Sequence, residues 1–126
     1  MNNLPRICWT VSACLGLAGM VWGMQMAGSG DHSNLAAHAH LNLLGWVGLA
    51  LYGTYYRLIG LTRSRVASIQ VGCAIVGSVI MGIGIAIAHQ GGTEAIAIIG
   101  SLLTLAAGGL FAAITFQRPL RINSGL

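Results

Sequence analysis

The chain has 126 residues, of which 56% are hydrophobic and only 6% are charged. Soluble domains carry about 25% charged residues, so the composition excludes a soluble globular protein and indicates an integral membrane protein. The net charge of +4 comes from six arginines against two acidic residues. These arginines lie at the ends of apolar runs and not in a basic patch, which argues against nucleic acid as a partner.

Four apolar runs follow one another along the chain, at about residues 7–27, 35–59, 66–88 and 93–116. About 20 apolar residues span the hydrocarbon core as a helix, so each run predicts one transmembrane helix. The connections are short, which favours antiparallel neighbours. We therefore expect an all-α integral membrane protein, with residues 1–126 forming a single four-helix transmembrane domain.

The arginines predict the orientation of these helices. They precede the first run, lie at the second connection and follow the fourth run, as Arg6, Arg57, Arg63, Arg65, Arg118 and Arg121. Asp31 and Glu94 lie at the other two connections. The positive-inside rule then places both termini in the cytoplasm. In a bacterial inner membrane the second helix begins near the periplasmic face, and Tyr55 and Tyr56 at its other end are expected in an interfacial aromatic belt.

Small residues recur at four-residue spacing in three of the runs. Gly19 and Gly23 form a GxxxG motif in the first run. Gly84 and Ala88 repeat the spacing in the third run, and a further series in the fourth comprises Gly100, Thr104 and Gly108. Such spacing lets helix backbones approach closely. The sequence leaves open whether the close partner belongs to the same chain or to a second copy.

The second run contains the residues most suited to chemistry, in the stretch AHAHLNLLGW. His38 and His40 are two positions apart, so on a helix they point about 200° apart and cannot chelate one metal. They serve two sites, or one serves a site and the other packs. Neutral imidazoles in an apolar bundle suit axial ligation of heme iron. Asn42, Ser33, Asn34 or a backbone carbonyl is then expected to hold a ring nitrogen. Gly45 is expected to leave room for the macrocycle, and Trp46 to contact it or pack in the core.

Further polar residues are predicted at the outer face. Asp31 and His32 precede the second run, and His89 and Glu94 lie at the third connection. Together they form a candidate site for a metal ion or heme propionates, or a solvated loop. The chain has no Cys-x-x-Cys-His motif, so any heme is expected to be non-covalent heme b.

The stretch GDHSNLAAHAHLNLLGWVGLALYGTYYRL, residues 30–58, resembles the heme–copper oxidase subunit I superfamily, and especially its small four-helix bacterial relatives. The core of the resemblance is HxHxNLxGW. In that family the twelve helices form three arcs of four, and the second helix of an arc carries heme-ligating histidines. The resemblance implies that His38 and His40 ligate different hemes shared between protomers. It favours a homotrimer, with a homodimer as the alternative.

The chain also departs from the family, because the separate copper-binding histidines are missing. This departure argues against oxygen or nitric oxide reductase activity and leaves open whether the protein is an enzyme. The favoured function is a bis-His heme b protein for electron transfer or for redox or gas sensing, with lipid and a redox protein or quinone as partners. Two alternatives are a small transporter or channel that uses the His pair for protons or metal ions, and a structural subunit whose histidines only pack.

Overall fold

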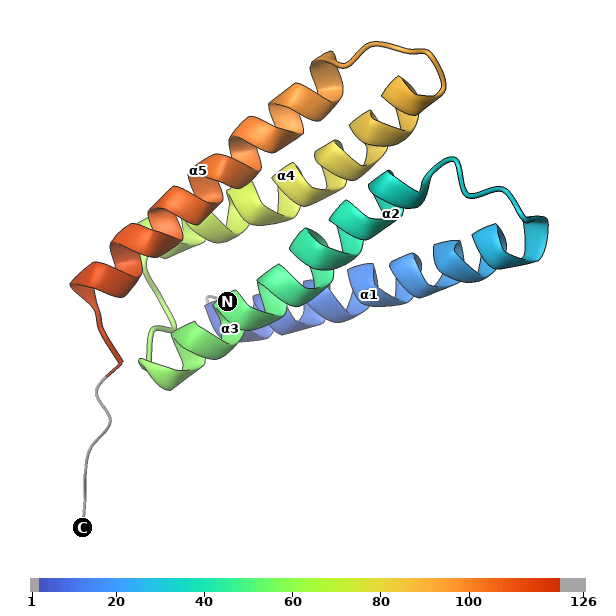
Figure 1. Ribbon diagram of the computed structural model, residues 1–126. Helices are drawn as coiled ribbons and strands as arrows, with labels where there is room; N and C mark the ends of the chain where they lie inside the picture. The colour runs from blue at the N-terminus through green and yellow to red at the C-terminus, as the bar shows by residue number, and fades with distance from the viewer. Residues whose placement is uncertain (1–2, 121–126) are drawn as a thin grey trace.

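The computed structural model describes residues 3–120, and all secondary structure within them is helical (Figure 1). The elements are α1 (Leu4–Ser29), α2 (Leu35–His40), the π-helix η1 (Leu41–Gly48), α3 (Leu49–Leu58), α4 (Arg65–His89) and α5 (Ala95–Gln117). The helices α1, α4 and α5 are each long and apolar enough to cross a membrane. The elements α2, η1 and α3 follow one another without a break and form the second helical run, residues 35–58.

Local sequence signals explain where these helices begin and end. The Asn3 side chain accepts a hydrogen bond from the backbone N–H of Arg6 at the start of α1, and Pro5 occupies the first turn, where its missing N–H costs nothing. Gly30 ends α1 in the left-handed conformation, with φ of 71°, which glycine adopts without steric cost. Ser64 caps α4 by accepting from Ala67 N–H.

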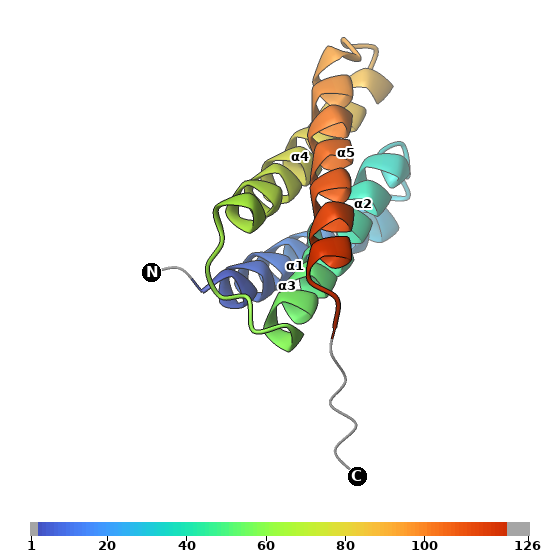
Figure 2. The same ribbon diagram turned by 90° about the vertical axis from the view of Figure 1, so that its left-hand side faces the viewer.

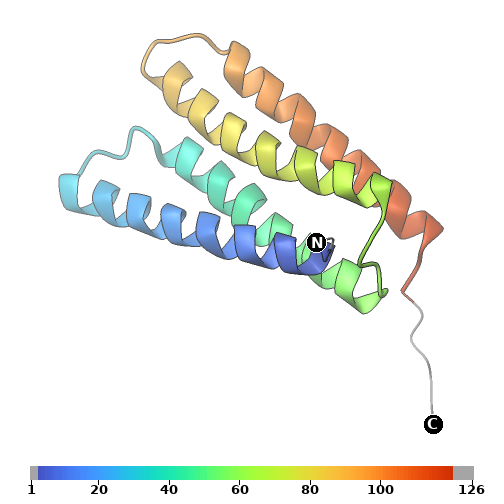
Figure 3. The ribbon, with the colours of Figure 1, turned by 180° about the vertical axis from the view of Figure 1, so that it is seen from behind.

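The first two helical runs pack against each other, as seen from behind in Figure 3. Early residues of α1 meet late residues of the second run. A methyl group on Gly53 would touch Cys8, and one on Gly23 would touch His38. The glycines of the predicted GxxxG motif therefore make contacts within the chain.

The helices α4 and α5 form a second close pair (Figure 2). A methyl group on Gly84 would meet the backbone of Ala97, and one on Gly77 would lie 2.9 Å from the backbone nitrogen of Thr104. These glycines also pack within the chain. Gly108 differs, because no described atom lies within 4 Å of the position its methyl group would take.

An aromatic and apolar cluster joins the two pairs at the end of the molecule where α3 ends and α4 begins. Tyr56 is fully buried there and donates a hydrogen bond to Gln70 Oε1 at 2.8 Å. The rings of Tyr52 and Phe111 lie 4.5 Å apart between α3 and α5. Tyr55 lies at the helix end and donates to the backbone oxygen of Arg118. The expectation of a surface belt is therefore wrong for Tyr56, because its hydroxyl is bound by a buried amide of α4.

Candidate functional site

The predicted site residues lie at and just after a change in helix type. The sequence predicts one regular helix here, but the eight residues of η1, directly after His40, form a π-helix that contains Asn42, Gly45 and Trp46. Such i→i+5 segments are rare and occur frequently at functional sites. A side chain of α1 binds the backbone of this π-helix: the hydroxyl of the buried Ser12 donates to the Trp46 carbonyl oxygen at 2.8 Å. The Trp46 carbonyl also accepts from the backbone N–H of Leu49 where α3 begins.

A groove of small residues on α1 receives the large side chains of this region. A methyl group on Gly16 would lie 2.8 Å from Trp46 Cγ. One on Gly19 would collide with the Asn42 amide, and one on Gly23 would lie 3.1 Å from His38 Cε1. The α1 groove, defined here as Ser12, Gly16, Gly19 and Gly23, therefore holds the η1 side chains in place. Only its last two members belong to the GxxxG motif of the sequence.

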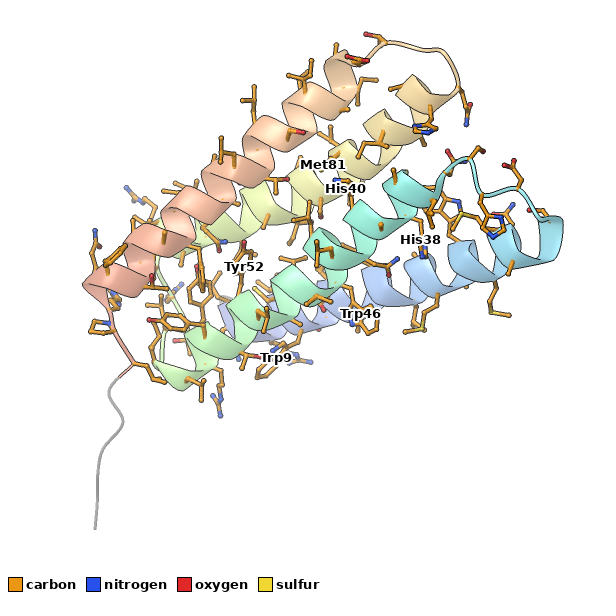
Figure 4. All side chains as sticks on the ribbon, in the orientation of Figure 1. Trp9, His38, His40, Trp46, Tyr52 and Met81 are labelled. Atoms are coloured by element: carbon orange, nitrogen blue, oxygen red, sulfur yellow. The ribbon has the colours of Figure 1, made fainter. Side chains whose placement is uncertain are left out.

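His38 lies half-buried against this groove (Figure 4). Its ring meets Trp22 edge-on, with 6.2 Å between ring centroids. The Asn42 Nδ2 atom donates to the His38 backbone oxygen at 2.9 Å and lies 3.2 Å from ring Nδ1 and 3.4 Å from Nε2. Because an amide N–H only donates, Nδ1 at the shorter distance accepts, and the proton of a neutral ring is then on Nε2. In this arrangement His38 packs and does not offer Nε2 as a ligand.

His40 has the opposite arrangement. Its side chain is exposed, and in Figure 4 it lies on a different side of α2 from His38. The ring Nδ1 lies 2.7 Å from the Ala36 carbonyl oxygen, and because a carbonyl only accepts, Nδ1 carries the proton and donates. The Nε2 lone pair is therefore free and points away from the backbone bond. Metal-ligating histidines show this same state, with one ring nitrogen bound to a backbone carbonyl and the other free for the metal.

Gly45 and Trp46 take part in packing. Gly45 is buried, and a methyl group there would lie 2.9 Å from Leu15 Cδ1 and 3.4 Å from Ser78 Oγ. Leu15 thus fills the space beside Gly45 that the sequence analysis reserves for a macrocycle. Trp46 lies across Gly16 and is 39% exposed, so one edge of its ring faces the outside of the molecule.

The polar residues of the outer connections bind locally. Asp31 Oδ1 accepts from the Ser33 backbone N–H at 3.0 Å, and this bond, together with the Ser33 hydroxyl and the nearby His32, lowers the pKa of the Asp31 carboxyl. The ring Nδ1 of His32 donates to the Gly30 carbonyl. His89 is the last residue of α4, next to the α4–α5 connection. Within residues 3–120 no three His, Cys, Asp or Glu side chains lie close enough to hold a metal ion.

The described chain has an apolar pocket of about 270 Å³ between α1, η1 and α4, lined by Trp22, Leu41 and Gly82 among others. Neither His38 nor His40 lines it. Its volume is below the range of about 300–1,000 Å³ typical of sites for drug-sized ligands, and a porphyrin is larger still. A heme on His40 therefore fits only against the outer surface of the chain, where the free Nε2 lies.

The chain matches none of the protein families, curated proteins or solved structures with which it was compared. The family resemblance therefore depends on the motif in residues 30–58 alone.

Proposed function

We propose that the protein is a membrane heme b protein in which His40 is the axial ligand, and that it serves electron transfer or redox or gas sensing. The observation that supports this proposal is the state of the His40 ring: its Nδ1 donates to the Ala36 carbonyl oxygen, which leaves Nε2 free on an exposed side chain. Iron held at this position supplies a one-electron redox centre or a gas-binding atom. The chain fixes the ring tautomer and orientation through the Ala36 carbonyl.

The four helical runs are proposed to cross a bacterial inner membrane in antiparallel order, with both termini in the cytoplasm. Support comes from the start of α1, the end of α3, the start of α4 and the end of α5, which lie on the same side of the molecule (Figure 1). Arg6, Arg57, Arg65 and Arg118 lie at or next to these helix ends in the sequence. Arg121, the sixth arginine of the sequence, lies outside the described residues. This orientation puts His40 in the outer half of the membrane.

The second axial ligand is proposed to come from another copy of the chain. On the exposed side of α2 the chain offers His40, while His38 faces the α1 groove. His38 of a neighbouring copy becomes a ligand once its ring leaves Asn42. In a homotrimer, each copy offers His40 to one neighbour and His38 to the other, and a homodimer is the alternative arrangement.

The test is an optical spectrum of the full chain, purified after heme-replete expression. We expect a Soret band and a b-type pyridine hemochrome, with heme lost in His40→Ala. His38→Ala should give a high-spin spectrum with the heme retained. His89→Ala is the matched control, because it removes a histidine next to a different connection, and it should leave the spectrum unchanged.

A colourless wild-type protein, or a His40→Ala variant with the wild-type spectrum, would refute the proposal. Stoichiometric copper or zinc without heme would support the transporter alternative instead. The mass of the purified complex separates a trimer from a dimer.

A further inference from the structure

The charges of the described chain are segregated between its two ends. The only acidic side chains, Asp31 and Glu94, lie in the α1–α2 and α4–α5 connections. The arginines of residues 3–120 lie where α1 begins, where α3 ends, where α4 begins and where α5 ends. Two hydrogen bonds hold the segments of this arginine-bearing end together. The Leu4 backbone N–H donates to the Thr62 oxygen, and the Tyr55 hydroxyl donates to the Arg118 backbone oxygen. This end of the molecule therefore has a strong positive potential with no carboxylate among its described side chains.

A pocket of about 390 Å³ lies at this end, between the last turn of α3 and the end of α5. It is lined by Leu58, Ile59, Gln117, Arg118 and Pro119. Two aliphatic residues come from the α3 side, and one amide-bearing and one basic residue come from the α5 side together with the proline. The pocket therefore brings apolar residues and an arginine together.

The Arg118 backbone is fixed in this position. Its carbonyl oxygen accepts from the Tyr55 hydroxyl at 2.8 Å, and its N–H donates to the Ile114 oxygen at 2.8 Å. The Tyr55 ring is itself packed against Phe111, with centroids 5.3 Å apart. The chain end that carries the guanidinium is thus attached to α3 through an aromatic contact and a hydrogen bond, so the pocket is built by both helices.

We propose that this pocket binds the headgroup of an anionic phospholipid. A guanidinium matches a phosphodiester with two parallel N–H donors, and the Gln117 amide can donate to glycerol or ester oxygens. Leu58, which is 61% exposed, and Ile59 then lie beside the start of an acyl chain. Helix ends of a spanning bundle lie at the depth of the headgroups, and a hydrogen bond between a guanidinium and a phosphate is stronger than one between neutral groups.

The inference rests on the membrane-spanning part of the proposed function and not on heme. A colourless protein that still binds the lipid would refute the heme proposal alone. A heme-loaded protein without lipid selectivity would refute the lipid site alone.

The test is a titration of the full chain in detergent with phosphatidylglycerol or phosphatidylcholine, followed by native mass spectrometry. We expect the first phosphatidylglycerol to bind more tightly than the first phosphatidylcholine. Arg118→Gln should raise its Kd at least about ten-fold, the ratio that corresponds to about 1.4 kcal/mol, because it removes a hydrogen bond between charged groups. Arg65→Gln is the matched control, since it removes the same charge at the same end but outside the pocket, and its Kd should change less than two-fold.

Leu58→Trp provides a second variant that fills the pocket without changing its charge, and it should weaken the lipid as well. Equal effects of Arg118→Gln and Arg65→Gln would show a diffuse charge field and overturn the site. A wild-type chain without preference for the anionic lipid would do the same. Displacement of the lipid by inorganic phosphate at matched ionic strength would assign the pocket to a soluble anion and would likewise overturn the proposal.

Discussion

Replacing Gly19 by alanine puts a methyl group where the Asn42 side chain lies. The new carbon would be 2.6 Å from Asn42 Nδ2 and 2.7 Å from its Cγ, far inside carbon contact distance. The amide therefore has to move away from α1. When it moves, it gives up the hydrogen bond to the His38 backbone oxygen at 2.9 Å and its contact with the His38 ring.

Three effects determine the size of the change. The lost hydrogen bond costs about 1 kcal/mol, and overpacking of a tight contact costs about 1–3 kcal/mol. Alanine in a helix interior gains up to about 1 kcal/mol over glycine. The cost of crowding and of the lost hydrogen bond exceeds the gain in helix propensity, so the free energy of unfolding of Gly19→Ala should fall by about 1–3 kcal/mol.

The assay is reversible unfolding in mixed micelles with increasing dodecyl sulfate, followed by circular dichroism. Gly108→Ala is the matched control, because it is the same change inside a helix and no described atom lies within 4 Å of the new methyl group. It should be neutral or up to about 1 kcal/mol more stable. Equal stability of the two variants would refute the close approach of α1 to η1.

Three further measurements test other contacts. Tyr56→Phe should cost about 1–3 kcal/mol because it leaves the buried Gln70 amide without its partner, and adding Gln70→Leu should recover most of that loss; simple additivity in the double-mutant cycle would contradict this. Gly84→Ala should destabilise by about 1–3 kcal/mol because its methyl group meets the α5 backbone, whereas Gly72→Ala, with no described atom within 4 Å, should not. The lowered pKa of Asp31 means that its stabilisation is present above the ordinary aspartate pKa and is lost as the pH falls through the folded-state value. Asp31→Asn should therefore lower the unfolding midpoint at pH 7 and not at a pH below both values, and a carboxyl resonance that titrates at the ordinary pKa would contradict the bond.

The helical runs could be predicted from the sequence to within about one helical turn. Apolar runs bounded by Gly30, Gly60 and Gly91 leave little choice, since each of these glycines adopts a positive φ in a connection. The opposite faces of His38 and His40 also followed from helix geometry, because α2 is a regular α-helix through both residues. These features depend on local sequence, so they can be predicted from one sequence without knowledge of tertiary contacts.

The different states of the two histidines could not be predicted in the same way. They depend on which side chain reaches which ring nitrogen, and Asn42 and Ala36 are each four residues from the ring they bind. The π-helical segment depends on contacts from a different helix, including the Ser12 bond to the Trp46 carbonyl. One signal was readable: Ser12 and Gly16 repeat the four-residue spacing of Gly19 and Gly23, and the three residues from Gly16 to Gly19 keep both pairs on one face of α1.

The α1 groove and the π-helix belong to one arrangement that separates the histidines. The groove leaves space between the helices for the side chains of His38, Asn42 and Trp46, of which the last two belong to η1. The same contacts leave His40 outside, with its ring oriented by its own helix. Under the proposed function, Asn42 would therefore decide whether one imidazole or two act as ligands. Freeing His38 would cost about 1 kcal/mol for each hydrogen bond given up, and contact with the proposed neighbouring copy would have to offset that cost.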